Sequence, residues 1–140
     1  WTGTDVVKAV GYEANVKHPA ARLEDYGVGV LEFASGAVAN LEHTWHVRRA
    51  GPGSGYLEIL GENGAVVTNG FLDKLAVTEV DGHGWTYVEK PAGRASIIDH
   101  VVEVMKGKAD LVANGEDAKR NLAACLAVYE SAKTGKPIKL

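Results

Sequence analysis

The chain has 140 residues, of which 46% are hydrophobic and 24% are charged, and its formal net charge is -3. This size suits one domain with a single core, and the small negative charge argues against a nucleic-acid-binding surface, which needs a basic excess. No apolar run reaches the ~18 residues of a membrane span and no charged-then-apolar leader opens the chain, so we expect a cytoplasmic protein. The single cysteine, Cys125, excludes an internal disulfide framework and suits a reducing compartment.

A first strand is predicted over Asp5 to Val16, where apolar and polar residues alternate loosely. Gly11 within it indicates a bulge or a point where another part of the backbone comes close. His18 and Pro19 end the strand, because proline lacks the N–H group that a strand ladder needs. The chain starts with Trp1 rather than methionine and enters a strand almost at once, so we expect a fragment of a longer protein.

Four strands in two hairpins are predicted between Asp25 and Val67. Turn residues separate the strands at Ala34-Ser35-Gly36 and at Glu62-Asn63-Gly64. By the period of two, the strand after the first turn has a core face with Ala37, Ala39, Leu41, His43 and Trp45. Its other face is half polar, as in a sheet open to solvent or to a partner subunit, and carries Val38, Asn40, Glu42, Thr44 and His46.

The connection between these two hairpins, Val47 to Gly55, is longer and richer in glycine than a tight turn requires. Long loops on a rigid sheet are where binding residues gather. We therefore take four residues as candidate substrate-binding residues: His46, Arg48, Arg49 and Tyr56. An arginine in such a loop offers a fork of donors to hydroxyl or carboxylate groups. The alternative is a solvated cationic loop.

A third hairpin is predicted from two short segments, Lys74 to Val80 and Trp85 to Val88, with an Asp-Gly turn signal between them. From Ala95 the apolar period becomes helical, and Gly107 ends this first helix. The sequence therefore changes from strands to helices in its last third.

A second helix starts near Glu116 and is capped by Gly135, and Lys136 to Leu140 forms a closing edge strand. Its apolar stripe is predicted to pack against the sheet and consists of Ala118, Leu122, Cys125, Leu126, Tyr129 and Ala132. On this stripe Cys125 is a buried, unreactive thiol. Strands followed by helices predict an α+β fold with an open, mostly antiparallel β-sheet, two helices packed on one face and the other face used for oligomerisation.

His43 and His46 stand three residues apart, and histidine is the commonest metal ligand. On a strand, residues three apart point to opposite faces, so these imidazoles cannot share one ion without a bulge. No metal site is therefore predicted, and His43 is expected to be a hydrogen-bonded residue on the core face beside Trp45.

Three segments carry a more specific pattern: Val30-Leu31-Glu32-Phe33 through Gly36 to Glu42 with Thr44-Trp45, then Leu57 to Gly64, and finally Gly115-Glu116-Asp117-Ala118 with Ala127 to Lys136. Together they resemble the C-terminal domain of the Gfo/Idh/MocA family (glucose-fructose oxidoreductase, inositol dehydrogenase and MocA). The resemblance covers about Val6 to Leu140, and its most specific part is Glu-Ser-Ala-Lys-Thr-Gly-Lys at positions 130–136.

The resemblance implies a two-domain protein in which a Rossmann domain binds NAD or NADP and residues 1–140 form the second domain. That second domain carries the substrate and builds dimers or tetramers. No Gly-x-Gly-x-x-Gly follows a strand in this chain, so no cofactor-binding residue is expected within it. No catalytic residue is expected either, because the family's Asp and His pair would lie upstream of Trp1.

Glu89-Lys90-Pro91 has the same letters as the motif that holds the family's catalytic lysine. The family motif ends a Rossmann strand, whereas this one stands between the last hairpin and the first helix of the second domain. We interpret the match as coincidence, with Pro91 serving only to break a strand.

These observations predict a substrate-binding and oligomerisation domain of an NAD(P)-dependent oxidoreductase that acts on a sugar, a polyol or a related carbonyl compound. Such a domain is not catalytic on its own. The alternative is a stand-alone noncatalytic module that serves only for self-association.

Overall fold

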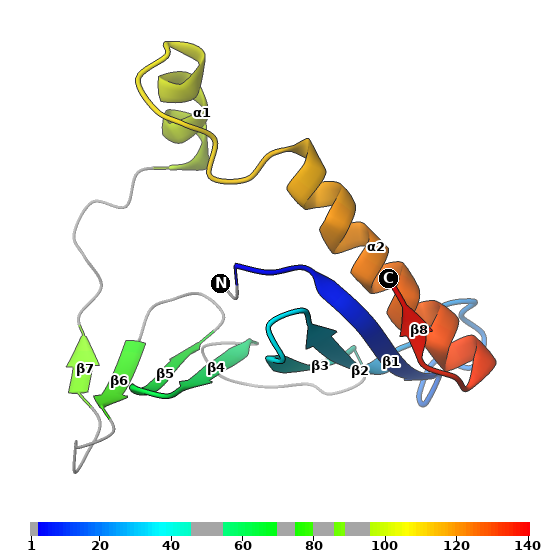
Figure 1. The fold of residues 1–140 in the computed structure, drawn as a ribbon. Coiled ribbons are helices and arrows are strands. Elements are labelled where there is room, and N and C mark those ends of the chain that lie inside the picture. The colour runs from blue at the N-terminus through cyan, green and yellow to red at the C-terminus, as the bar shows by residue number, and fades with distance from the viewer. Residues whose placement is uncertain (1–2, 46–54, 70–74, 80–85, 89–95) are drawn as a thin grey trace. The chain divides into compact units, whose positions relative to one another are not determined.

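The computed structural model describes residues 3–45, 55–69, 75–79, 86–88 and 96–140 (Figure 1). The chain divides into two compact units, one formed by Trp1–Arg48 with Asp110–Leu140 and the other by Arg49–Ala109. The first strands and the C-terminal helix thus belong to one unit, although the whole second unit separates them in the sequence.

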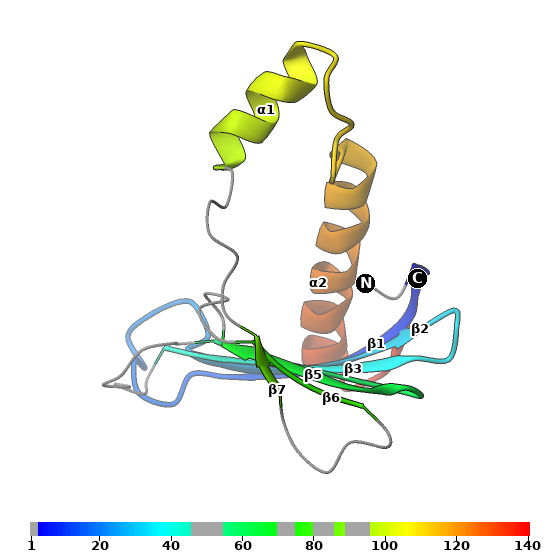
Figure 2. The same ribbon diagram turned by 90° about the vertical axis from the view of Figure 1, so that its left-hand side faces the viewer.

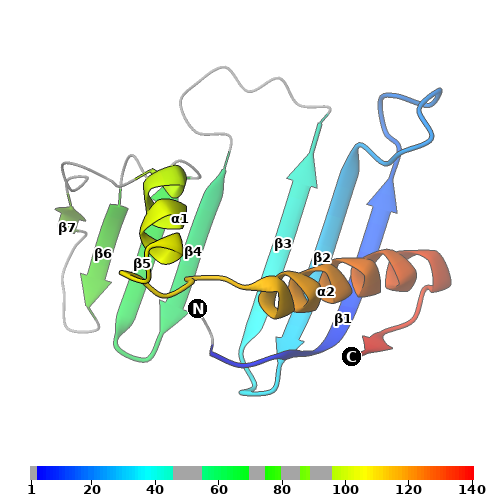
Figure 3. The same ribbon diagram turned by 90° about the horizontal axis from the view of Figure 1, so that it is seen from above.

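The first unit contains a four-stranded antiparallel sheet. Its strands lie in the order β3-β2-β1-β8 (Figure 3), with bounds β1 (Val6–Ala14), β2 (Tyr26–Phe33), β3 (Val38–Thr44) and β8 (Ile138–Lys139). The hairpin of β2 and β3 turns at the predicted Ala34-Ser35-Gly36, where Gly36 has a φ of 85° that favours glycine. β8 pairs with β1 and is the predicted closing edge strand.

Helix α2 (Gly115–Thr134) lies on one face of this sheet and contacts β1, β2 and β8 (Figures 1 and 2). A capping box fixes its first turn, because the Asn114 side chain accepts from the Asp117 N–H and the Asp117 carboxylate accepts from the Asn114 N–H. Gly135 ends the helix with a left-handed φ of 67° and donates its N–H to the Ser131 carbonyl, which confirms the predicted cap.

Small side chains build the core between α2 and the sheet. Ala9 of β1, Leu31 of β2 and Ala127 of α2 form its buried centre, and partly buried residues surround them, namely Val6, Phe33, Ala39, Val128 and Ile138. Gly11 of β1 lies where the helix comes closest, since a Cβ atom there would be 2.1 Å from the Val128 carbonyl oxygen. The predicted close approach at Gly11 is therefore confirmed.

The buried face of α2 differs from the predicted stripe. The buried residues are Ala124, Ala127 and Ser131. The large members of the predicted stripe are exposed, with Leu122 at 59% and Leu126 at 57%. Cys125, predicted to be buried, is exposed as well. The prediction was wrong because a helix this close to the strands has room only for small side chains on its sheet-facing side.

The alternation along β3 follows the prediction only in part. Ala39 packs against the core, but Leu41, His43 and Trp45, predicted for the same core face, are exposed. Among the described residues, α2 contacts β1 and β2 but not β3. The predicted core face is therefore wrong along the second half of β3, because the helix does not cover it.

The second unit contains another antiparallel sheet, in the order β4-β5-β6-β7. Its strands are β4 (Tyr56–Gly61), β5 (Gly64–Asn69), β6 (Leu75–Glu79) and β7 (Thr86–Val88), and they form both predicted hairpins. Helix α1 (Ile97–Met105) begins with a capping box of Ser96 and Asp99, and none of its residues is buried. The described residues thus form antiparallel sheets and two helices, and one helix packs on a sheet. This arrangement confirms the α+β class.

Candidate functional site

The four predicted substrate-binding residues lie around the long loop after β3. His46, Arg48 and Arg49 are outside the described residues, and Tyr56 is the first residue of β4, with only its backbone described. The structure therefore leaves this prediction untested. Glu89-Lys90-Pro91 also lies outside the described residues. The structure does describe the corner of the first sheet that includes Trp45, the residue before His46 in the sequence, and Asp25 is the central residue of this corner.

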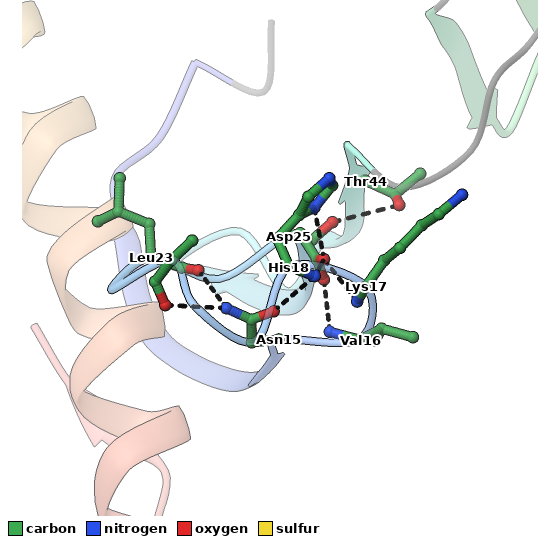
Figure 4. Close-up of polar contacts among 8 residues, drawn as sticks. Asn15, Val16, Lys17, His18, Leu23, Asp25 and Thr44 are labelled. Atoms are coloured by element: carbon green, nitrogen blue, oxygen red, sulfur yellow. Dashed lines mark hydrogen bonds and ion pairs between the residues drawn. The ribbon is translucent and has the colours of Figure 1, made fainter.

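The backbone of Asp25 joins three strands at this corner. Its N–H donates to the carbonyl of Ala14, the last residue of β1, at 3.1 Å. Its carbonyl accepts from the hydroxyl of Thr44, the last residue of β3, at 3.3 Å (Figure 4). It also accepts from the N–H of the next residue, Trp45, at 2.8 Å. One residue thus connects the end of β1, the start of β2 and the end of β3.

Asp25 is buried, with 3% of the residue exposed, and its carboxylate accepts hydrogen bonds from the turn that follows β1 (Figure 4). The N–H of Val16 donates at 2.7 Å, that of Lys17 at 2.8 Å and that of His18 at 3.0 Å, and the His18 ring Nδ1 lies 3.0 Å away. These bonds, with Val16 the largest contributor, hold the pKa of Asp25 well below its usual range against the opposing effect of burial. Asp25 is therefore a charged residue at every physiological pH.

The side chain of Asn15 holds together the connection between β1 and β2, residues 15–25. Its side-chain amide donates to the carbonyls of Ala21 at 3.1 Å and Leu23 at 3.0 Å, and its side-chain oxygen accepts from the His18 N–H at 3.0 Å. Sequence reasoning missed both Asn15 and Asp25. The available signal was an Asn followed by His18-Pro19, since asparagine and aspartate side chains bind nearby backbone groups in turns.

Two further side chains meet on the α2 side of the corner. The Tyr129 hydroxyl of α2 donates to the carboxylate of Glu24, the residue before Asp25. This bond raises the pKa of Tyr129 to about 12, and burial adds to the shift. The same bond is the main reason that the pKa of Glu24 is lowered, with a smaller contribution from His43. The corner is thus tied to α2 as well as to the three strands.

The ring of His43 of β3 lies over Gly27 of β2, on the face of the sheet where α2 packs. A Cβ atom at Gly27 would be 2.3 Å from the Cε1 atom of the His43 ring, so only glycine leaves room for the imidazole. Within the described ranges, no group of three or more His, Cys, Asp or Glu side chains is arranged to hold a metal ion. The polar and charged side chains described at this corner therefore bind backbone groups and hold the connection between β1 and β2 in place.

A hollow of about 760 Å³ lies elsewhere in the first unit, between the segment before β1 and the first half of α2. The charged groups that line it are paired with one another. Nε of Arg120 lies 3.5 Å from Oδ1 of Asp5, and Nη2 of Arg120 lies 2.5 Å from Oδ1 of Asp117. The residues described as its lining include no residue of the Asp25 corner. We therefore place the candidate site at the Asp25 corner, where the predicted substrate loop begins.

Solved structures share this fold across almost the whole chain. An aldose-aldose oxidoreductase from Caulobacter crescentus, complexed with glycerol, is 21% identical with a TM-score of 0.81, and the match covers 99% of this chain and 42% of that one. An oxidoreductase from Agrobacterium radiobacter, in complex with NAD+, L-tartaric acid and magnesium, is 20% identical with a TM-score of 0.76 over 96% of this chain and 43% of that one. At these identities the likeness shows the fold.

The WlbA dehydrogenase from Bordetella pertussis, in complex with NADH and UDP-GlcNAcA, is 26% identical with a TM-score of 0.70. That match covers 97% of this chain and 39% of the dehydrogenase, so the chain spans about two fifths of the length of these three proteins. A comparison with curated proteins finds no match. No helix in the described ranges is both long and apolar enough to cross a membrane.

The family comparison agrees with the resemblance that the residues carry. The family model described as "Oxidoreductase family, C-terminal alpha/beta domain" matches residues 1–140. The chain therefore belongs to the Gfo/Idh/MocA oxidoreductases, as their C-terminal α/β domain.

Proposed function

We propose that the chain is the substrate-binding and oligomerisation domain of an NAD(P)-dependent oxidoreductase acting on a sugar, a polyol or a related carbonyl compound. The observation that carries the proposal is the family match over residues 1–140, while the chain spans about two fifths of its solved relatives. A dinucleotide-binding domain in the same protein would supply the cofactor site. Crystals of relatives with NADH and UDP-GlcNAcA, and with glycerol, support this cofactor and substrate class.

The loop after β3 is the proposed substrate contact, through Arg48 or Arg49 together with His46 or Tyr56. In the protein that includes the dinucleotide-binding domain, we expect one of the variants Arg48→Ala and Arg49→Ala to raise KM for the sugar or polyol about tenfold, as loss of a charged hydrogen bond would. Arg22→Ala, an exposed arginine of the 15–25 connection, is the control. If all three variants leave KM unchanged, the arginines belong to a solvated loop.

The chain itself is proposed to bind no dinucleotide, because it contains no glycine-rich turn between a strand and a helix. Calorimetry of residues 1–140 with NAD(H) and NADP(H) tests this. Binding tighter than about 100 micromolar would move the cofactor site into this domain and contradict the proposed division of labour.

The sheet face opposite α2 is the proposed surface for self-association. Ala9, Gly11 and Leu31 face the helix, so the exposed residues that alternate with them, Val10, Tyr12, Val30 and Val38, point the other way. Apolar side chains gathered on an open sheet face are typical of an interface between subunits. This surface is also what favours the alternative function, a noncatalytic self-association module.

Light scattering at micromolar concentration tests the surface. Val38→Lys should release monomers, because Val38 is 63% exposed on the proposed interface and lysine would bring an unpaired charge into it. Val112→Lys, at a position 86% exposed in the loop before α2, is the matched control. A monomeric wild type would remove oligomerisation from the proposal. An oligomer in a protein without a dinucleotide-binding domain would favour the alternative.

A further inference from the structure

Helix α2 leaves a hollow between its first half and the sheet on which it packs. Its second half lies close to the strands, where the Gly11 N–H reaches the Ser131 hydroxyl at 3.0 Å, whereas its first half rises from the sheet (Figures 1 and 2). The hollow beneath the first half has a volume of about 760 Å³. Native interiors leave few voids larger than a water molecule, so a space of this size between a helix and its own sheet is room for another segment.

The hollow has an apolar lining of four residues. Val6 of β1 and Phe33 of β2 are partly buried against the core, and Ala123 and Ala124 of α2 lie on the helix side. Among the described residues, the buried hydrophobic side chains are alanines apart from Leu31. So small a core gains little free energy from burial, and apolar side chains placed in the hollow would enlarge it.

The polar groups around the hollow are engaged within the chain. Nε of Arg120 lies 3.5 Å from Oδ1 of Asp5, and Nη2 of Arg120 lies 2.5 Å from Oδ1 of Asp117. The Thr4 hydroxyl donates to the Ser35 hydroxyl at 3.1 Å. A phosphate or carboxylate ligand would have to compete with two carboxylates for the guanidinium, so the hollow does not suit an anion. An apolar centre with a polar rim is instead the pattern of a contact between protein segments.

The residues ahead of β1 lie at this hollow, since Gly3, Thr4 and Asp5 line it. Gly3 has a φ of 66°, the left-handed conformation in which a glycine commonly ends a helix. The family match is to a C-terminal domain, and the solved relatives extend well beyond the matched part. We propose that the hollow is the docking site for a helix of the segment that joins the dinucleotide-binding domain to this one. This inference rests on the proposed function, which supplies that domain.

A covalently joined helix suits the hollow better than other occupants do. A helix satisfies its own backbone hydrogen bonds, which an extended segment lying on apolar side chains would leave unpaired. A joined segment acts at an effective concentration of about a millimolar or more, whereas a second copy of the chain competes at its own concentration. Docking in the hollow would fix the position of the first domain relative to the sheet and α2.

A thiol in the apolar lining measures docking in the protein that carries both domains. Ala123→Cys, with Cys125→Ser to remove the exposed native thiol, adds a cysteine at a lining position that is exposed in residues 1–140. Val112→Cys in the same background is the control, because Val112 is 86% exposed and is not described as lining the hollow. We expect iodoacetamide to modify the Ala123→Cys peptide at least about tenfold more slowly than the Val112→Cys peptide, by mass spectrometry. Equal rates would overturn the inference.

A photo-crosslinker attached to the Ala123→Cys thiol identifies what protects it. We expect a crosslink within one polypeptide, to the segment up to about 20 residues ahead of Gly3, the length of a helix that spans a small domain. A crosslinked product of doubled mass, or protection that disappears on dilution, would assign the hollow to a second copy and overturn the inference. If Ala123→Cys does not fold, Asn121→Cys offers a second lining position for both measurements.

Dinucleotide binding by the same protein separates the two possible failures. If NAD(H) binds while the Ala123→Cys thiol reacts as fast as the control, the docking inference fails and the proposed function stands. If neither NAD(H) nor NADP(H) binds, the proposed function fails, and the labelling and crosslinking still decide whether the segment ahead of Gly3 occupies the hollow.

Discussion

The two sides of helix α2 differ in a way that reverses the usual relation between side-chain size and burial. The side toward the sheet buries Ala124, Ala127 and Ser131. The side away from it exposes more than half of each of two leucines, Leu122 and Leu126. Large apolar residues usually lie inside and small polar ones outside, so hydrophobicity alone does not explain this arrangement.

The strands explain the difference. Gly11 of β1 and Gly29 of β2 face each other across the ladder, and both lie under Val128 of α2. The missing side chains let the helix backbone come close, and the Gly11 N–H reaches the Ser131 hydroxyl at 3.0 Å. A leucine in place of Ala127 or Ser131 would not fit at this distance. Glycine in the strands and small residues in the helix together define the docked face.

Gly11→Ala should have the largest effect on this arrangement. The new Cβ atom would lie 2.1 Å from the Val128 carbonyl oxygen, which is backbone and cannot rotate away, so the helix must move off the sheet. We expect a loss of about 3 kcal/mol in the free energy of unfolding, measured by urea denaturation. Gly115→Ala is the control, because nothing lies within 4 Å of a Cβ there. Equal stabilities of the two variants would show that the close approach is not needed.

Ser131→Ala should have the next largest effect. Ser131 is the acceptor for the Gly11 N–H, and it is almost completely buried, so its loss leaves a buried donor without this bond. The expected cost is about 2 kcal/mol by thermal or urea unfolding. Thr134→Ala, which removes an exposed hydroxyl from the same helix, should change stability by about 0.5 kcal/mol or less. A neutral Ser131→Ala would mean that water replaces the hydroxyl at this contact.

A pair of truncations tests the reversed relation between size and burial directly. Val128→Ala removes contacts with the strand glycines and should cost about 1.5 kcal/mol, whereas Leu126→Ala should cost less than about 1 kcal/mol, although it removes more atoms. The stripe predicted from the sequence would require the opposite order, with Leu126 the costlier. Urea midpoints that rank Leu126→Ala as the more destabilising variant would therefore restore the predicted stripe.

The parts of the fold that depend on local chemistry were predictable from the sequence. Turn and cap positions such as Gly36 and Gly135 follow from φ angles that glycine tolerates best, and they are where the sequence placed them. The docked face of α2 was not predictable by periodicity, which selects large apolar residues and overlooks small ones. Gly11 was the residue that signalled close approach, but the sequence alone does not say which residue approaches it.

The candidate site was predictable only as a region. The length and glycine content of the connection after β3 mark a binding loop, and His46, Arg48 and Arg49 stay predictions because they lie outside the described residues. Asp25 was missed because its partners are backbone N–H groups, which every residue except proline has. The residues Asn15 to Pro19 signal a turn, but the spacing of side chains does not identify which carboxylate binds its main chain.

The smallest expected effect concerns the exposed side of α2, where the Tyr129 hydroxyl binds the Glu24 carboxylate. The pair is partly exposed, with Tyr129 at 43%, so Tyr129→Phe should lower the free energy of unfolding by about 0.5 kcal/mol or less at neutral pH. The pKa of Tyr129 is raised to about 12, above its ordinary value near 10, so the contribution is complete below about pH 10 and disappears as the pH rises through about 12. The pKa of Glu24 is lowered, so the contribution also disappears as the pH falls below about 4. Unfolding free energies of wild type, Tyr129→Phe, Glu24→Gln and the double variant, measured across this range, should show a coupling confined to the interval between these limits. Additive effects of the two substitutions at pH 7 would mean that the bond contributes nothing, and that α2 is held to the sheet by its small-residue face alone.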